Sequence, residues 1–585
     1  MEEKDKEQII DREEIILESI DSKKIRRIKK KLTRIFFVFV ILLSMAVFPI
    51  FFYKKELNRN LLSVSYKKGV YHIHSTFSDG TGNIDKISKA AQKNNLDFIL
   101  MTDHGRPNVK CSEATGWENG VLIIGGSEFS LNCGHLATAG YDFKNKRDYV
   151  FPPEPQEAIN DVNKTEGITF ISHPLDGKIP WTDWDIEGFT GIEILNSYSS
   201  AKKTSILNLL QFPIQYLFNH NYALLNTLSY PKDNFKLWDD FNNKGDYYGI
   251  YALDAHSKLP ITRKLVFMWP TYEAMFNIFT VYVKIDRDFD RDPEYSAQYI
   301  IDSIRKGKFF SVIEAIAPAN GFEAFFIGKN GISYDIGSKV QDISGSILLK
   351  LPFSFKTNIV VKRNGKDFKI IKDNYKKELR ISISNRGTYR VEVFVSDNTF
   401  NKLPWILANP FFIGKRTINK EKNIVSRIKR KIIIYDNLFK IEKNNNSVAN
   451  LSLVKNNSET ILKVEYSLRK QKDTSDFWVA LAQRRKLNFL GYSGITFKTK
   501  SDKARRFWLE LRTKQDGEEL NYKHSFLSDT TWQKVFIPFN KLKLEASKNK
   551  KLNLSKVIAL FFSLNNSLSY VNASGTLEIT DIGLF

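Results

Sequence analysis

Short apolar runs alternate with polar, helix-compatible stretches through the first half of the chain. Within residues 66–307 these runs are GVYHIH, DFILMTDH, VLIIGGSE, GHLATAG, GITFISHP, GIEILNS and YGIYALDAHS. A strand followed by a helix, repeated in this way, predicts a parallel sheet with helices outside it, either open or closed into a barrel. Residues 197–247, rich in Leu, Phe, Tyr and Asn, interrupt the rhythm and are expected to form a mostly helical insertion.

The pattern changes to closely spaced strands after a helical segment near Tyr295–Arg305. Residues 308–415 contain alternating runs broken by Gly, Asn and Asp, with the size and spacing of a small β-sandwich. A basic stretch, Lys415–Lys431, is predicted to be a linker. More strands follow over residues 432–585, and they predict a second, larger sandwich of jelly-roll type.

One uninterrupted apolar segment lies near the N-terminus. Residues 35–53 are 19 consecutive uncharged residues, IFFVFVILLSMAVFPIFFY, about the length of a helix that crosses a hydrocarbon core. Lys and Arg are denser before this segment than after it, so the positive-inside rule predicts a cytoplasmic tail at 1–34 and export of everything beyond the anchor. Ser44-Met45-Ala46 resembles a signal-peptidase site, but the apolar run continues past it. We therefore expect an uncleaved, single-pass anchor in the cytoplasmic membrane, with the rest of the chain periplasmic or extracellular.

Composition limits the classes of protein to consider. A chain of 585 residues is too long for one hydrophobic core, so several domains are expected. The formal net charge of +23 comes without a run of arginines, zinc-finger spacing or a helix-turn-helix pattern. It therefore predicts attraction for an anionic substrate, glycan or lipid surface, and no specific nucleic-acid binding. Two cysteines, Cys111 and Cys133, are too few for a disulfide scaffold, and they leave open one bridge or two free thiols.

Histidines and carboxylates gather at the ends of the apolar runs. Residues two apart in a strand point to the same face, so His72 with His74, and Asp254 with His256, can each offer two ligands to one ion. In a barrel of parallel strands such ends converge on one face. The candidate ligands are His72, His74, Asp79, His104, Glu128, His135, His173, Asp254 and His256. Nine donors exceed what one ion can use, so the sequence predicts two or three divalent metal ions.

This set of residues resembles the ligand set of the polymerase and histidinol phosphatase (PHP) family. The resemblance covers roughly residues 68–270 and implies a distorted, TIM-like (β/α)7 barrel over 66–307 with a trinuclear metal centre. Asp79 at the third motif position is a choice shared with family members that hydrolyse small phosphate esters. The resemblance implies three ions, held by His72, His74, Glu128 and Asp254, by Glu128, His135 and His173, and by Asp79, His104 and His256.

Hydrolysis of a phosphomonoester or phosphodiester by a metal-activated hydroxide is the chemistry that follows. The N and O donors are compatible with Mn, Fe or Zn and do not choose among them. Asp103 and His256 are the candidate catalytic residues, since Asp103 lies beside the ligand His104 and can orient it or protonate a leaving group. Basic residues that closely follow ligands are expected to grip the anionic phosphorylated substrate, and these are Arg106, Lys178 and Lys258.

Two weaker resemblances concern the β-rich regions. PWILANPFFIG, at residues 404–414, resembles the end of an immunoglobulin-like domain found behind some exported PHP domains. The final region, which closes on LEITDIGLF, resembles a galactose-binding-type jelly roll of the kind that serves as a carbohydrate-binding module, so a cell-envelope glycan is a candidate partner. Trp508 and Trp532 both lie in strand-like runs of this region and are expected in its core.

Two other functions stay open at this point. One is a cell-surface glycan-binding or scaffold protein whose barrel has a minor catalytic role or none. The other is a metal-dependent amide hydrolase, because related metal barrels also attack carbonyl carbon. His220 and His524 lie outside the ligand pattern and are expected to be structural or surface residues.

Overall fold

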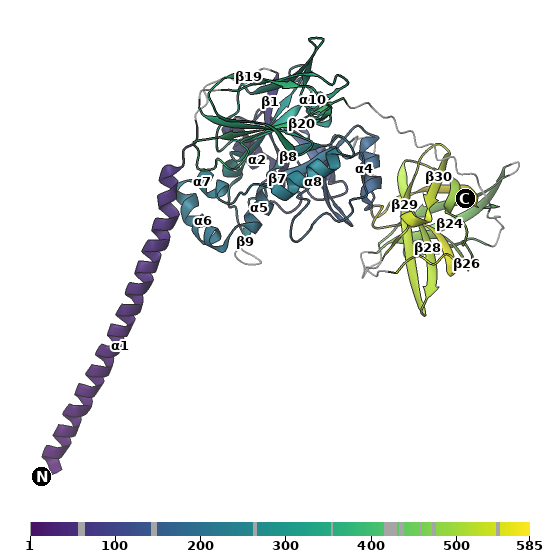
Figure 1. The fold of residues 1–585 in the computed structure, drawn as a ribbon. Coiled ribbons are helices and arrows are strands. Elements are labelled where there is room, and N and C mark those ends of the chain that lie inside the picture. Colours follow the sequence, from purple (N-terminus) through teal and green to yellow (C-terminus); the bar gives the residue numbers. More distant parts are fainter. Residues whose placement is uncertain are drawn as a thin grey trace.

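A long N-terminal helix projects from a body built mostly of β-sheet in the computed structural model of the chain (Figure 1). The structure describes residues 2–56, 65–141, 149–260, 266–352, 355–414, 430–431, 438–456, 459–470, 476–545 and 550–585. Helix α1 (Glu2–Val47) continues into a short 3-10 helix, η1 (Phe48–Phe52). Residues Arg26–Phe52 form a helical segment that is long and apolar enough to cross a membrane.

Seven strands of one sheet form the framework of the first half of the body, in the order β1-β2-β4-β5-β6-β7-β8. Strands β2, β6, β7 and β8 are buried at every residue, which explains why they are continuous apolar runs: both faces of the sheet are covered. The seven strands are β1 (Tyr66–Ile73), β2 (Phe98–Met101), β4 (Val121–Leu131), β5 (Gly134–Ala139), β6 (Ile168–Ile171), β7 (Gly191–Asn196) and β8 (Tyr248–Ala252).

Most neighbours in this framework are parallel, as the alternation of strands and helices predicts, but β5 is not. The pairs β1–β2, β2–β4, β6–β7 and β7–β8 are parallel. Strand β5 is antiparallel to both β4 and β6. Only Asn132 and Cys133 separate β4 from β5, and a two-residue connection is too short for a crossover helix. A hairpin therefore stands where a βα unit is expected.

The end of β8 returns to the end of β1. Leu253 donates a backbone hydrogen bond to the carbonyl of Tyr71, and Ala255 donates one to His72, each of 3.1 Å. The amide of His74 in turn donates to the carbonyl of Ala255 at 3.0 Å. These bonds bring the carboxyl ends of the first and last strands of the framework together, and both ends carry candidate ligands.

Helices cover the framework and form the insertion. Those on the framework are α2 (Ile84–Lys93), α3 (Val109–Glu113), α4 (Pro155–Asn163), α9 (Tyr272–Phe276) and α10 (Pro293–Arg305). The stretch 197–247 contains α5 (Ser197–Lys203), α6 (Ile206–Phe218), α7 (His220–Leu225) and α8 (Lys232–Asn242). Asn196, Ser205 and Asn219 cap the first three of these helices through their side chains, which explains why each begins where it does.

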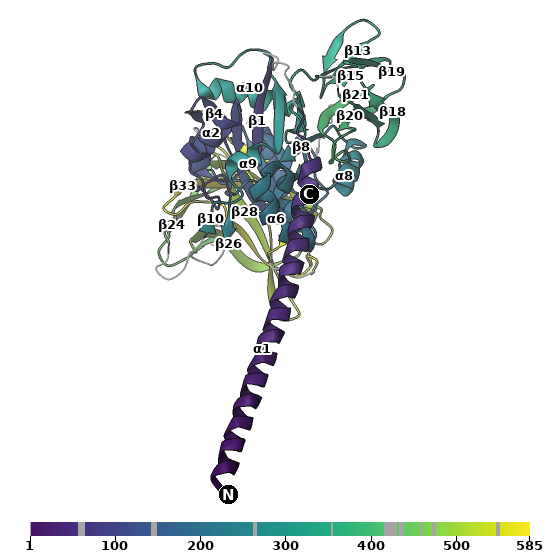
Figure 2. The ribbon, with the colours of Figure 1, turned by 90° about the vertical axis from the view of Figure 1, so that its left-hand side faces the viewer.

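Residues 308–415 do not begin a separate sheet. Strands β11 (Phe279–Lys284) and β12 (Phe309–Ile313) link the framework to β21 (Ile406–Ile413) and to the edge strands β20 (Gly387–Val395), β17 (Thr357–Arg363) and β18 (Lys366–Asn374), all within one 15-stranded sheet. A four-stranded sheet faces this part, made of β14 (Ser333–Asp335), β13 (Glu323–Gly328), β16 (Gly345–Lys350) and β19 (Glu378–Ile383). Figure 2 shows these strands gathered beside the framework. The domain boundary expected at 307/308 lies within this continuous sheet and stays a prediction.

The C-terminal region is a β-sandwich, as expected, made of two six-stranded sheets. One contains β22 (Arg430–Lys431), β24 (Val448–Asn456), β25 (Glu459–Ser467), β27 (Gly494–Ser501), β30 (Gln533–Pro538) and β33 (Ser574–Leu584). The other contains β23 (Lys440–Lys443), β26 (Trp478–Leu487), β28 (Arg505–Gln515), β29 (Glu518–Ser528), β31 (Lys543–Leu544) and β32 (Val557–Asn565). Residues 415–429 of the expected linker and 432–437 at the start of the expected domain lie outside the described residues.

The two tryptophans of the sandwich differ. Trp508 is 1% exposed, which confirms the expectation that it lies in the core. Trp532 is 40% exposed, so the same expectation for Trp532 is wrong. Trp532 stands in the short turn before β30, outside the alternation of that strand. A residue beyond the end of a strand escapes the inward and outward alternation on which the expectation depended.

Polar contacts join the sandwich to the framework through α4, which faces β29 in Figure 1. The buried guanidinium of Arg506 donates to Asp161 at 2.6 Å and to Glu157 at 2.8 Å. The backbone amide of Ser525 donates to Glu154 at 2.9 Å. These contacts hold the C-terminal sandwich against the outside of the framework.

Candidate metal centre

Seven of the nine predicted ligands lie at the carboxyl ends of framework strands or in the loops that follow them. Glu128 lies within β4, and His135 lies at the start of β5, which reaches the same edge because it runs antiparallel to β4. His72, His173 and Asp254 have backbone φ angles of 67°, 30° and 53°, in the left-handed region that residues other than glycine rarely adopt. Such strain persists only where the surrounding structure enforces it, and it is concentrated at functional sites. Three of the nine candidates therefore carry a mark of function that is independent of their residue type.

Glu128, at the middle of β4, is the centre of the cluster. It is buried, and its two carboxylate oxygens lie within 3.5 Å of five imidazole nitrogens. The distances from Oε1 are 3.4 Å to His72 Nε2, 3.3 Å to His135 Nδ1 and 3.2 Å to His173 Nε2. Those from Oε2 are 3.5 Å to His74 Nε2 and 3.2 Å to His104 Nδ1. A bridging role for this carboxylate is compatible with that position.

Two further carboxylates complete the cluster. Asp254 Oδ1 lies 3.6 Å from His72 Nε2, 3.5 Å from His74 Nε2 and 3.4 Å from His256 Nδ1. Asp79 Oδ1 lies 3.1 Å from His256 Nε2. Asp79 is the most exposed of the three and stands at the edge of the cluster that solvent reaches.

The donor atoms fall into three overlapping groups in which all atoms lie within 4.8 Å of one another. These groups are His74, Asp79, His104 and His256; His72, His74 and Asp254; and His104, Glu128 and His135. They differ from the expected division among three ions in that His74 and His104 each belong to two groups, Glu128 belongs to one, and His173 belongs to none. The assignment of ligands to ions, and the number of ions, stay predictions.

Neighbouring carboxylates perturb the imidazoles strongly. Burial alone would lower the pKa of His72, but Glu193, Glu128 and Asp254 outweigh burial and raise it well above its usual value. The pKa of His173 rises to about 9 despite burial, because Nε2 of its ring lies 3.2 Å from the carboxylate of Glu128. Burial lowers the pKa of His104 to about 4. The carboxylates attract positive charge to this site, and protons and metal ions compete for it.

The residues present fit divalent cations. Four buried atoms of the cluster have no hydrogen-bond partner within the described parts of the chain: Glu128 Oε1, His104 Nδ1, His135 Nδ1 and His173 Nδ1. A buried polar atom without a partner costs about 1–3 kcal/mol, and more if it is charged, so such a group in a folded protein calls for a ligand. Imidazole and carboxylate donors suit Mn, Fe or Zn.

Glu193, in the middle of β7, belongs to the site although its sequence position did not single it out. Its Oε1 lies 2.5 Å from His72 Nδ1, and its Oε2 accepts hydrogen bonds from the amide of His173 at 2.8 Å and from Asn196 at 2.9 Å. It thereby leaves His72 Nε2 directed at Glu128 and Asp254. The available signal was a carboxylate within the apolar run GIEIL, since buried glutamates are rare unless they are paired.

Asp103 lies against the loop that follows β1 and carries Asp79. It is fully buried, and both of its oxygens accept hydrogen bonds from the loop after β1. Oδ1 accepts from the amide of Ser75 at 2.8 Å and from Ser78 Oγ at 2.6 Å, and Oδ2 accepts from Ser75 Oγ at 2.8 Å. Asp103 therefore fixes the loop between His74 and Asp79, and its role as a proton donor stays a prediction.

The three basic candidates have different surroundings. Lys258 Nζ lies 3.6 Å from Asp79 Oδ2, at the rim of the cluster. Arg106 donates to the carbonyls of Phe151 at 2.7 Å and of Ser567 in the C-terminal sandwich at 3.1 Å, and phosphate binding by this residue stays a prediction. Lys178 is exposed, and the hydrogen bond of this residue to Asp176 is made by its backbone amide. Cys111 and Cys133 are both buried free thiols.

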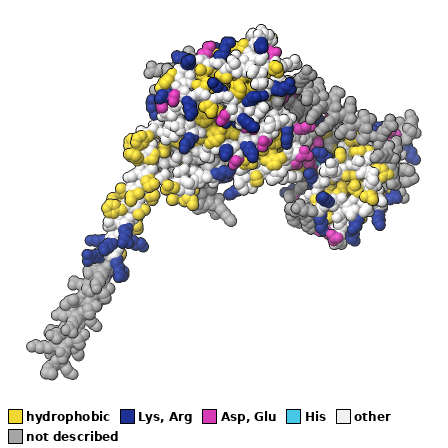
Figure 3. All heavy atoms as spheres, viewed as in Figure 1, with side chains coloured by type: hydrophobic (Ala, Val, Ile, Leu, Met, Phe, Trp, Pro, Cys, Tyr) yellow, Lys and Arg dark blue, Asp and Glu magenta, His cyan; other side chains and the backbone are white. Residues whose placement is uncertain are grey.

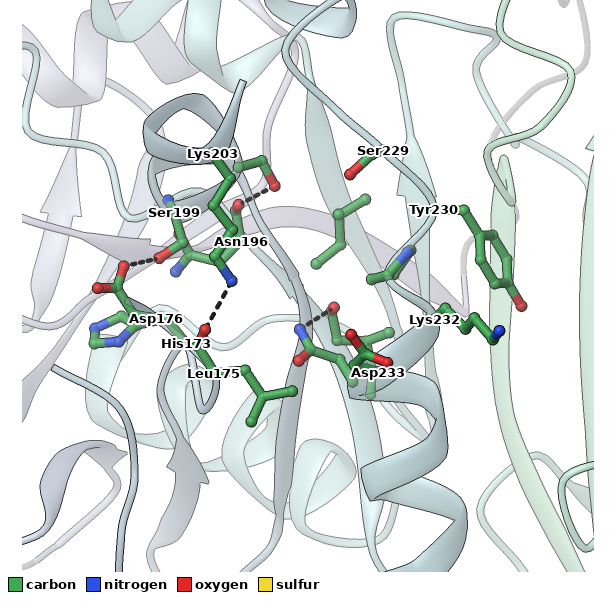
Figure 4. A pocket seen from close by; sticks show the side chains of 15 residues that line it. His173, Leu175, Asp176, Asn196, Ser199, Lys203, Ser229, Tyr230, Lys232 and Asp233 are labelled. Carbon is green, nitrogen blue, oxygen red and sulfur yellow. Dashed lines mark hydrogen bonds between the residues drawn. The ribbon is translucent and has the colours of Figure 1, made fainter. Parts of the chain in front are cut away.

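A cavity of about 310 Å³ adjoins the cluster at His173 (Figure 4). It lies between the ends of β6 and β7, helix α5 and the start of α8. Lys203 and Lys232 contribute positive charge to its lining, and Asp176 and Asp233 contribute negative charge. Ser199 Oγ donates to Asp176 at 2.7 Å, as the dashed line in Figure 4 shows. A polar substituent of a substrate bound at the cluster has room here.

Comparison with known proteins gives distant similarities. No curated protein matches the chain. The family model for Complex I intermediate-associated protein 30 (CIA30) matches residues 447–578. A two-domain protein from Bacteroides vulgatus ATCC 8482, containing a predicted PHP-like metal-dependent phosphoesterase, is 15% identical over 62% of this chain and 98% of its own, with a TM-score of 0.29.

Carbohydrate-binding modules are among the other similar structures. The family 11 module from Clostridium thermocellum, in complex with a β-1,3-1,4-mixed-linked tetrasaccharide, is 14% identical over 27% of this chain and 97% of its own, with a TM-score of 0.23. The family 30 module of a cellulosomal cellulase from Clostridium thermocellum is 19% identical over 23% and 81%, with a TM-score of 0.18. Membership of the PHP family stays a prediction, and the function has to be argued from the geometry of the site.

Proposed function

We propose that this chain is an exported, membrane-anchored, metal-dependent hydrolase of phosphate esters. The observation that carries the proposal is a mostly buried cluster of eight predicted ligands, with His173 joined to it through Glu128, in which several donor atoms have no hydrogen-bond partner among the described residues. The carboxylates of Asp79, Glu128, Glu193 and Asp254 lie among the imidazoles, and their negative charge favours the binding of divalent cations. A phosphate ester, itself anionic, is a suitable substrate for a site that cations have made electropositive.

Divalent cations, when bound, would supply Lewis acidity toward phosphate and water. The protein's own part is to hold and orient. Glu193 fixes the His72 ring through Nδ1, and Asp103 fixes the loop that carries Asp79. Lys258, at the solvent-facing edge, is placed to pair with a phosphate oxygen. The cavity beside His173 would accept the remainder of the substrate.

The fold proposals that accompany this function concern closure and location. We infer that the framework is a distorted barrel, and its support is the set of backbone bonds between residues 253–255 and 71–74. We also infer that α1 crosses the membrane once with its N-terminus in the cytoplasm. The basic residues before Arg34, exposed on α1 where they are described, support that orientation.

The test uses the full chain purified in detergent, with its metal content measured directly. We expect two or three divalent ions per chain and hydrolysis of p-nitrophenyl phosphate or its bis-ester. His72→Ala and Asp254→Ala should lose metal and activity together, whereas His220→Ala, a histidine outside the cluster, should retain both. A preparation without metal, inactive on a broad panel of phosphate esters, would refute the proposal. Cleavage of amides in place of phosphate esters would favour the amide-hydrolase alternative.

Glycan binding by the C-terminal sandwich is a second candidate, favoured by one observation. Trp532 presents its ring to solvent at 40% exposure, and exposed tryptophans suit stacking on sugars. We expect Trp532→Ala to weaken retention of the chain on immobilised cell-envelope glycan without changing phosphate ester hydrolysis. Val571→Ala is the control, because Val571 is another exposed apolar residue of the sandwich. A buried aromatic residue such as Phe539 would not be a suitable control. Equal retention of all forms would remove this candidate.

A further inference from the structure

Helix α6 has the reverse of the burial pattern expected for a helix on a water-soluble protein. Its buried residues are Gln211 and Gln215, of which Gln215 is 1% exposed. Its exposed residues are apolar, among them Leu210 at 64% and Leu217 at 85%. No charged residue occurs between Ile206 and Phe218. A helix normally directs its apolar stripe inward, so α6 is matched to surroundings more apolar than water.

This helix packs against the end of α1, as Figures 1 and 2 both show. Residues 26–41 of α1 are exposed, whereas Leu42, Leu43, Ala46 and Val47 are wholly or partly covered. Ala46 lies twelve residues after Arg34, about 18 Å along a helix at 1.5 Å per residue. A hydrocarbon core is about 30 Å thick, so with Arg34 at one surface of the membrane, this contact lies inside the core.

The apolar surface extends beyond α6. Phe212 and Tyr216 pack edge-on against Trp269, each with ring centroids 5.1 Å apart. Val266 and Met268, next to this tryptophan, are exposed. Aromatic side chains are enriched where a protein enters the membrane interface. Figure 3 shows hydrophobic side chains continuing from α1 onto the adjoining part of the body.

The connection between α1 and the body is fixed by hydrogen bonds. Tyr53 donates its hydroxyl proton to the carbonyl of Ala315 at 2.7 Å, and Lys55 Nζ donates to Asn277 at 2.8 Å. The amide of Glu56 donates to Ile316 at 2.9 Å. The body therefore has a set orientation relative to the anchor, and the same face of α6 stays beside α1.

We propose that α6 is a second membrane contact, lying within the outer part of the bilayer that α1 crosses. Thirteen residues of helix extend about 20 Å, too short to span the core, so α6 lies along the membrane instead of across it. Helix α5, which precedes α6, begins at Asn196, a residue bonded to Glu193 and Asp254 of the cluster. Insertion of α6 would thus hold the metal cluster close to the membrane surface. This inference does not depend on the reaction catalysed.

The experiment places a single nitroxide label on the full chain reconstituted in lipid vesicles. Leu217→Cys reports on α6, and Leu490→Cys, an apolar residue of the distant sandwich with 67% exposure, is the matched control. The native cysteines are buried and do not compete for label. Accessibility to oxygen and to a water-soluble nickel chelate is measured at both positions. Leu210→Cys repeats the measurement if the first variant fails to fold.

We expect the ratio of oxygen to nickel accessibility at position 217 to exceed that at 490 several-fold, as it does for a label within lipid. Nickel accessibility at 217 equal to that at 490 would show a face open to water and overturn the proposal. Dipolar broadening that disappears on dilution with unlabelled chain would show that a second copy covers α6, and would also overturn it.

Discussion

Two of the buried clusters of charged side chains in the described part of this protein differ in how their charge is balanced. At the contact between the C-terminal sandwich and α4, the Nε, Nη1 and Nη2 atoms of Arg506 all donate hydrogen bonds. The acceptors are Asp161, Glu157, Ser525 and the hydroxyl of Tyr149. Every donor nitrogen of this guanidinium is satisfied by the chain itself.

The cluster around Glu128 is the opposite case. Carboxylates and imidazoles crowd within a few ångströms of one another, and Glu128 Oε1 has no hydrogen-bond partner in the described part of the chain. Lys258 approaches only at the rim, beside Asp79. Comparison of the two clusters shows that burial of charge does not by itself indicate function. The informative feature is a buried set of donors that only an external cation can complete.

The largest expected effect comes from removing the central carboxylate. Glu128→Gln keeps the shape of the side chain but deprives five imidazoles of their shared negative partner. We expect loss of bound metal and a hydrolysis rate reduced to that of buffer, measured by elemental analysis and initial rates. Glu157→Gln makes the same chemical change in the Arg506 cluster and should leave metal content and rate intact. Normal metal content in Glu128→Gln would contradict the central role of this carboxylate.

Breaking the self-contained cluster should affect stability and leave the chemistry unchanged. Arg506→Met leaves the buried carboxylate of Asp161 without its guanidinium partner, although Tyr149 and the more exposed Lys164 still contact it. Breaking a comparable buried pair costs about 3–5 kcal/mol, and Lys164 should reduce this loss. We expect a correspondingly lower free energy of unfolding in denaturant titrations, with unchanged metal content. Adding Asp161→Leu removes the uncompensated charge and should recover most of the loss. If Arg506→Met instead depletes metal, the two clusters are not independent.

A smaller effect is expected for the residue that orients a ligand. Glu193→Gln retains a side chain that can still contact His72 Nδ1 but removes the charge that fixes the ring. Loss of such an outer partner typically lowers metal affinity or activity about 10–100-fold. Glu314→Gln is the matched control, because Glu314 is a buried carboxylate bonded to Lys68 and Thr280, away from the cluster. Competition with a chelator measures the affinity of both variants, and equal affinities would refute the role of Glu193.

The convergence of most candidate ligands was predictable because its signal is local. A histidine or carboxylate that closes an apolar run reveals both a strand and its end, so His72, His173 and Asp254 could be placed on one edge without coordinates. Glu193 was missed because it lies inside such a run, and its signal, a carboxylate among apolar residues, differs from that of a ligand at the end of a run. The β4–β5 hairpin was missed because strand alternation does not specify direction.

Long-range partners set the other limit. Arg106 is adjacent to the ligand region in sequence, but one acceptor of its guanidinium, the carbonyl of Ser567, is 461 residues distant. The apolar composition of α6 was visible in the sequence. Only the structure shows that Gln211 and Gln215 form its buried side. The neighbours that a side chain meets depend on contacts between distant segments, which a local sequence pattern does not specify.

The most gradual predicted effect is a dependence of metal affinity on pH. We compare His173 of the metal cluster with His524, which lies beside Arg506. The pKa of His173 is raised to about 9, so without metal the ring holds a proton at neutral pH. Pairing of this charged ring with Glu128 contributes its full stabilisation below the unfolded pKa, near 6.5. That stabilisation is lost as pH rises through 9, while metal binding, which needs the neutral imidazole, becomes easier. Metal affinity should therefore increase up to about pH 9, by at most about tenfold per unit for this proton.

Burial lowers the pKa of His524 beside Arg506, so the Arg506 contact should show no such change between pH 7 and 9. Calorimetric titrations in buffers of different ionisation enthalpy measure the proton released, and a proton count of zero at pH 7 would show that His173 does not carry the competing proton.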